Sequence, residues 1–114
     1  MLIAKERPIV LTPRQEIDKL RDAALNHPES TVSIEVTTGV FASFQTDPDS
    51  LKRLNDTMTT FLALGGAPAG FEWRDVDNVN HPADLTLLGG IAAAKAASDL
   101  IVWQKSWADK DALV

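Results

Sequence analysis

Acidic and imidazole side chains, the groups that most often hold metal ions, cluster in one short segment. His81 is close in sequence to Asp75, Asp77 and Asp84. The run from Asp75 to Asn80 is similar to the start of a calcium-binding loop, which places oxygen-bearing side chains at alternate positions. It lacks the glycine at the sixth place and the glutamate at the twelfth. We therefore interpret the segment as a solvated polar turn and predict neither a metal nor another cofactor.

Other catalytic chemistry has no sequence signature here. His27, like His81, precedes a proline at a helix boundary. There is no Gly-x-Ser-x-Gly elbow and no phosphate-binding loop, because the glycine pairs 65–66 and 89–90 have no adjoining Lys-Ser or Lys-Thr. Cysteine is absent, which excludes thiol nucleophiles, disulfides and cysteine-based metal sites. We predict that the chain is not an enzyme; a small enzyme or ligand-binding protein remains a remote alternative.

Size and charge narrow the classes of partner. A chain of 114 residues fits one domain, so we expect 1–114 to fold as a unit, with 1–11 as an extended lead. The formal net charge is −5 and the eleven basic residues are scattered, which argues against nucleic acid and anionic membranes as partners. The first residues are too short an apolar run for a secretory signal, and no run approaches the roughly 18 apolar residues of a membrane span. We expect a protein that is cytosolic when made.

The elements follow from local signals. Thr12-Pro13 with Gln15 begins a helix, and Asp47-Pro48 begins another that ends at the glycine pair 65–66. Alternating apolar residues at 32–36 and 40–44 flank a glycine-bearing turn and predict a β-hairpin. Residues 71–75 predict a third strand, with a fragment of a fourth near Val79. The fold class is therefore α+β: a small antiparallel sheet packed with three helices, the last one long.

The last helix begins near 82–84 and extends for about 28 residues, or roughly 40 Å. We expect the glycine pair 89–90 to be its bend or point of close approach. Trp103 and Trp107 are four residues apart and share a face. They either fill the core or anchor another protein chain, whereas Trp73 alternates with polar neighbours and should face the core. The predicted buried stripe consists of Leu85, Leu88, Ala92, Ala96, Trp103 and Ser106, and it is flanked by Leu87, Ile91, Ile101 and Val102.

Two segments together resemble a family of domains of unknown function found in tailed-phage and prophage proteins, often encoded beside tail-fibre genes. The first runs from a hairpin-end phenylalanine into a Thr-Asp helix start and an Arg-Leu pair. The second is a tryptophan strand, a turn and the closing apolar helix. The resemblance covers about 12–113, and this chain departs from it in the insert at 76–83. The residues that match are Phe44, Asp47, Ser50, Arg53, Leu54, Trp73, Arg74, Asp77 and Asn78.

The resemblance implies where the protein works. The family has no recognised catalytic residues, so none transfers. It implies a bacteriophage or prophage protein that acts by protein–protein contact in the host cytoplasm, as a chaperone or adaptor in tail-fibre assembly whose partner is a tail-fibre or tail protein. The alternative is a structural component of the virion tail, oligomeric through the long C-terminal helix. The residues we expect to touch a partner are Trp103 and Trp107.

Overall fold

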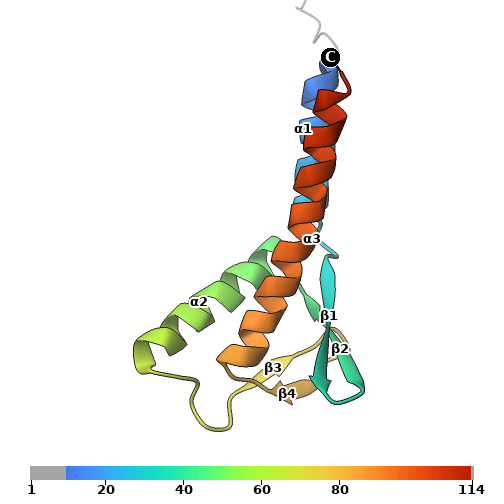
Figure 1. The fold of residues 1–114 in the computed structure, drawn as a ribbon. Helices are drawn as coiled ribbons and strands as arrows, with labels where there is room; N and C mark the ends of the chain where they lie inside the picture. The colour runs from blue at the N-terminus through green and yellow to red at the C-terminus, as the bar shows by residue number, and fades with distance from the viewer. Residues whose placement is uncertain (1–9, 114) are drawn as a thin grey trace, which may run out of the picture.

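The computed structural model describes residues 10–113, so most of the predicted N-terminal lead lies outside the described residues. The elements occur in the order α1 (Pro13–Leu25), β1 (Thr31–Thr37), β2 (Val40–Gln45), α2 (Pro48–Leu64), β3 (Glu72–Arg74), β4 (Asn80–Pro82) and α3 (Leu85–Asp111). Figure 1 shows two parts. The head contains the strands, α2 and the first part of α3, and the stalk consists of α1 lying beside the second part of α3. The predicted α+β class with a long final helix is confirmed.

The helices begin and end where local sequence signals place them. Thr12 and Gln15 form a capping box at the start of α1, each side chain bonding the other's backbone N–H. Asp47 caps α2, and Gly65 ends that helix in the left-handed conformation with φ 84°. Asp84 caps α3 by accepting a hydrogen bond from the Leu87 backbone N–H at 2.9 Å. These caps explain why the predicted helix boundaries at the first two helices hold.

The strands form two separate antiparallel sheets of two strands each. The hairpin pairs β1 with β2, from Thr31 opposite Gln45 onward, and turns at Gly39 with φ 77°. The second ladder pairs β3 with β4 over three residues each. The Val76 N–H donates to the Ser43 carbonyl at 2.9 Å, which among residues 10–113 is the one backbone hydrogen bond between the hairpin and the segment of the second ladder, where we expected a third strand of one sheet. The four strands do not form one continuous sheet, because β3 pairs with β4 and not with the hairpin.

The hydrophobic core lies in the head. Its largest fully buried apolar side chains are Phe44, Leu54, Leu88 and Ile91. Trp73 packs against this cluster, as expected, while remaining half-buried. In contrast, α1 contains no buried residue. The apolar core therefore ends where the stalk begins.

The buried side of α3 differs in part from the predicted stripe. Leu88 and Ser106 are buried, and Leu85, Ala92 and Trp103 are half-buried, but Ala96 is exposed. Ile91, predicted to flank the stripe, is fully buried, whereas Ile101, also predicted to flank it, is 68% exposed. Lys95, which was not predicted, is also buried. The reason is that α3 packs on β1 and α2 in the head and on α1 in the stalk, so its contact side is not one regular stripe. The helix also continues through the glycine pair 89–90, where a Cβ on Gly89 would make an ordinary contact, 3.9 Å from Met58 Cε.

Candidate interaction surface

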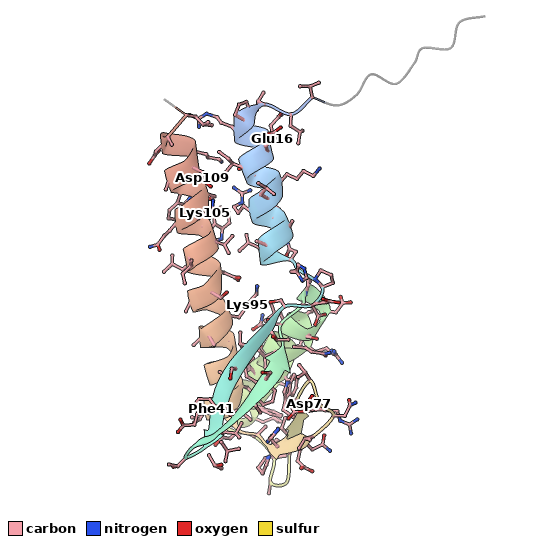
Figure 2. The ribbon with its side chains drawn as sticks, turned by 90° about the vertical axis from the view of Figure 1, so that its right-hand side faces the viewer. Glu16, Phe41, Asp77, Lys95, Lys105 and Asp109 are labelled. Carbon is pink, nitrogen blue, oxygen red and sulfur yellow. The ribbon has the colours of Figure 1, made fainter. Side chains whose placement is uncertain are left out.

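The stalk is joined to the head at Lys95, which is 5% exposed although it carries a charge. Its Nζ donates to the Leu25 carbonyl oxygen at 3.0 Å, at the end of α1, and lies 2.7 Å from Asp99 Oδ1. Figure 2 shows Lys95 at the level where α1 gives way to the strands. A cation at a helix C-terminus satisfies a free carbonyl and meets the negative end of the helix dipole. Lys95 thus fixes the end of α1 against α3.

Further along the stalk, polar groups again make the contacts between the two helices. The Arg21 guanidinium lies 4.4 Å from the ring centre of Trp103, and it also pairs with Asp18 at 2.7 Å. Lys110 Nζ of α3 reaches the same Asp18 carboxylate at 2.6 Å. The hydrogen bond from Lys110 is the largest cause that lowers the pKa of Asp18 below its usual range. The inner side of the stalk therefore combines ion pairs and one cation–π contact with the half-buried apolar side chains of Ile17 and Val102.

The outer side of the stalk is apolar. Leu100, Ile101 and Trp107 are 51%, 68% and 52% exposed. At 100° per residue, Lys95, Ser106 and Lys110 define the side of α3 that faces α1. The middle of the opposite side is uncharged and consists of Ala93, Ala97, Gln104 and Ala108, while Trp107 and the exposed Lys105 lie at its two edges. The outer side of this half of α3 therefore carries fewer charges than the exposed side of a surface helix usually does.

A groove runs along the stalk between α1 and α3. It has a volume of about 350 Å³ and is lined on its apolar part by Ile17, Leu20, Ala24, Ile101 and Val102. Leu20 is 72% exposed at this groove. The apolar surface of the stalk therefore extends from α3 onto α1.

The structure separates the roles of the two tryptophans that sequence placed together. Their ring centres lie 6.1 Å apart. Trp103 is half-buried beneath Arg21 and belongs to the packing of the stalk, whereas Trp107 is more exposed on the outer side. Lys95 and Arg21, which hold the stalk together, were missed by sequence reasoning. The signal that could have found Lys95 is its place within an otherwise alanine-rich stretch of helix.

Most of the residues that carry the family resemblance meet in the head. Ser50, Arg53, Trp73, Arg74 and Asn78 line one cavity of about 280 Å³ beside Asp75. Arg53 Nη2 donates to Ser50 Oγ at 3.3 Å, and Arg74 Nε donates to Asn80 Oδ1 at 3.0 Å. The remaining members are structural: Phe44 and Leu54 are core, Asp47 is a helix cap, and Asp77 lies exposed in the turn.

Asp75 organises the turn that sequence marked as a metal-like segment. Its carboxylate accepts hydrogen bonds from the backbone N–H groups of Asp77 and Val79, and lies 2.7 Å from His81 Nε2. The hydrogen bond with His81 is the largest cause that lowers the pKa of Asp75. The His81 ring meets Phe44 edge-on at 5.6 Å, which connects the turn to the core. Within residues 10–113, no three histidine, aspartate or glutamate side chains are grouped so as to hold a metal ion.

The apolar character of α3 bears on the expectation that no segment approaches a membrane span. Its 18-residue window of highest hydropathy averages 1.5, so by length and composition this helix is able to cross a bilayer. One such helix is weak support for a span, because core helices of soluble proteins pass the same test. Here 17% of the window is buried within the chain, so a core position does not explain its hydropathy. The outer side of α3 needs another explanation.

Comparison with known proteins gives one match. No curated protein matches the chain, and no solved structure does. The family model that matches is DUF4376, described as a domain of unknown function, and it covers residues 11–114. Since that match includes nearly the whole sequence, the chain belongs to the DUF4376 family of domains of unknown function.

Proposed function

We propose that this chain is a non-catalytic protein-contact module of bacteriophage or prophage tails, acting as an accessory, a chaperone or adaptor, in tail-fibre assembly. The observation that carries the proposal is the charge-poor outer side of α3, where Leu100, Ile101 and Trp107 are half-exposed or more. Large exposed apolar patches on soluble proteins mark contact sites, and tryptophan is enriched among the residues that dominate binding energy. The resemblance over 12–113 to proteins encoded beside tail-fibre genes supports the biological setting.

The head supports a role in binding over one in catalysis. The polar side chains around its 280 Å³ cavity bond one another: Arg53 with Ser50, and Arg74 with Asn80. Asp75 and His81 form a close pair, but Asp75 also accepts two backbone N–H groups and so serves the turn. Groups used in this way hold the fold of the head and leave the stalk as the surface offered to other molecules.

Co-expression with the neighbouring tail-fibre protein tests the proposal. We expect the fibre protein to become more soluble and more fully trimeric when this chain is present. Trp107→Ala should reduce that effect, whereas Thr59→Ala, a change at an exposed position on α2, should leave it unaltered. If the fibre protein is equally soluble and equally trimeric without the chain, the assembly role is excluded.

A structural role in the virion is the second candidate, and the exposed length of α3 favours it because long apolar helices commonly join subunits. Mass spectrometry of purified particles separates the two roles. An assembly accessory should be missing from the finished particle, whereas a structural component should be present in a fixed number of copies.

A further inference from the structure

The outer side of α3 has the spacing of a coiled-coil seam. Ala93, Ala97, Leu100, Gln104 and Trp107 are exposed and separated by alternating steps of four and three residues. We call these five residues the outer seam. A helix with this spacing packs against another helix with the same spacing, and a second copy of the chain supplies such a helix. We infer that the outer seam is the contact between two copies of this chain. The inference names a second copy as the subunit that α3 joins in the structural role given above as the second candidate, and it rests on that role, because a seam closed by a second copy is not free for a fibre protein.

The size of the surface agrees with a pair of chains. Trp107, Leu100 and Gln104 are all exposed and present roughly 100 Å² apiece, and Ala93 and Ala97 bring the total for the seam to about 400–500 Å² per copy. Two copies would bury about 1,000 Å², which is near the lower limit for a specific interface. The apolar groove with Leu20 and Ile101 lies next to the seam and enlarges the area available.

The side-chain sizes along the seam fix its direction. Small alanines occupy one end and Trp107 the other, with Leu100 midway, about 10 Å from each. In a parallel pair, Trp107 would meet Trp107 and hold the helices apart, while Ala93 would face Ala93 across a gap. In an antiparallel pair, each Trp107 packs against the partner's Ala93, and Leu100 meets itself at the twofold axis. Close packing at constant helix spacing therefore favours the antiparallel pair.

A second copy also fits better than a lipid surface. Helices that lie on membranes usually carry lysine and arginine on the polar face and bind anionic lipid. The exposed charges of α1 are of both signs, Arg14 and Lys19 beside Glu16 and Asp22, and do not form a basic face. The net charge of the chain is −5, which disfavours binding to an anionic bilayer.

The oligomeric state tests the inference directly. Sedimentation equilibrium over about 1–200 μM should show wild-type particles of twice the 12.4 kDa of one chain. Leu100→Glu places two carboxylates at the axis and should weaken association by about 100-fold or more. Thr59→Glu, at an exposed position on α2, is the matched control and should associate like the wild type. Far-UV circular dichroism checks that both variants keep their helices, and Ala97→Glu serves as a second seam variant if Leu100→Glu does not fold.

Cross-linking tests the direction of the pair, because the chain has no cysteine. Leu100→Cys should form a disulfide with itself. Ala93→Cys alone should not, whereas a mixture of Ala93→Cys and Trp107→Cys should cross-link, since a disulfide requires Cα atoms within about 7 Å. Self-linking of Ala93→Cys would overturn the antiparallel arrangement.

Three outcomes would overturn the second copy as occupant. They are a wild-type chain that stays monomeric throughout the concentration range, a dimer that survives Leu100→Glu, or a monomer that binds vesicles of phosphatidylcholine and phosphatidylglycerol through the seam. The proposed function is separable from this inference: a chain that is monomeric by itself but solubilises its fibre protein through Trp107 would refute the dimer and leave the assembly role standing.

Discussion

Replacing Lys95 by methionine tests how a buried charge holds the stalk to the head. Methionine keeps an unbranched apolar stem of similar length and removes the ammonium group. The change leaves the Leu25 carbonyl without its donor and leaves Asp99 without the cation 2.7 Å away. The helical position and the surrounding alanines are unaltered. The variant therefore isolates the polar contact at the end of α1.

The expected loss is about 2 kcal/mol of unfolding free energy. Hydrogen bonds to charged groups contribute about 1.5–3 kcal/mol, and removal of one partner from a fully buried ion pair costs about 3–5 kcal/mol. The higher figure does not apply in full, because the Asp99 side chain is 30% exposed as a whole, although its Oδ1, which faces Lys95, is buried. The desolvation of the ammonium group, which the variant no longer has to overcome, offsets part of the loss.

Urea denaturation at one fixed protein concentration, followed by tryptophan fluorescence, measures the difference. Lys105→Met is the matched control, because Lys105 also pairs with an aspartate four residues later but is 75% exposed, and it should cost less than about 0.5 kcal/mol. The double variant Lys95→Met with Asp99→Leu should recover most of the loss, since it removes the unpaired carboxylate as well. A Lys95→Met variant within about 0.5 kcal/mol of the wild type, or one equal to Lys105→Met, would refute the reasoning.

Other changes have effects that follow from local contacts. Trp107→Ala, made in the monomeric Leu100→Glu background, should cost about 1 kcal/mol or less in urea, because half of the indole is already exposed; a loss near 4 kcal/mol would place it in the core. Asp47→Ala removes the cap of α2 and should cost about 1 kcal/mol in the same assay, and no loss would show that the cap is dispensable. Asp75 has a folded pKa below its ordinary 3.8, so its contribution to stability is present above pH 3.8 and is lost as pH falls through the folded value. Melting temperatures taken from pH 5 downward should fall, and Asp75→Asn, which cannot form the charged hydrogen bond with His81, should weaken that dependence; an identical slope in both proteins would contradict this account.

The features that sequence predicted well are those set by neighbouring residues. The cap at Thr12, the Asp47-Pro48 start and the exit at Gly65 each depend on side chains or backbone freedom within a few positions, so their signals are complete in a short window. The hairpin followed from alternation on both sides of a turn. The pairing of β3 with β4 was less visible, because three residues are too few to show a period.

The candidate surface could not be predicted from the sequence, because it depends on contacts between distant segments of the chain. Sequence grouped Trp103 with Trp107, since four residues on a helix share a face, but it did not show that Arg21, eighty-two positions earlier than Trp103, would cover one ring and leave the other open. No contact was predicted for Lys95 from the sequence. It is buried because the chain returns the end of α1 to that point, which no local pattern indicates.

The stalk raises a question of energy that a second copy answers. An isolated helix of 13 residues is marginal in water, and α1 has no buried residue to stabilise it. Buried polar contacts such as the hydrogen bond from Lys95 to the Leu25 carbonyl set the position of α1 on α3 more than they lower the free energy of folding. Leu100 lies on the side of α3 that points away from α1. If pairing through the outer seam supplies the apolar burial that the stalk lacks, a change at Leu100 should nevertheless loosen the structure of α1. We therefore expect Leu100→Glu to speed amide hydrogen exchange in α1 by at least tenfold while the amides around Phe44 in the head stay protected. Unchanged exchange in α1 would mean that its inner contacts suffice, and that the apolar side of α3 serves something other than the stability of the stalk.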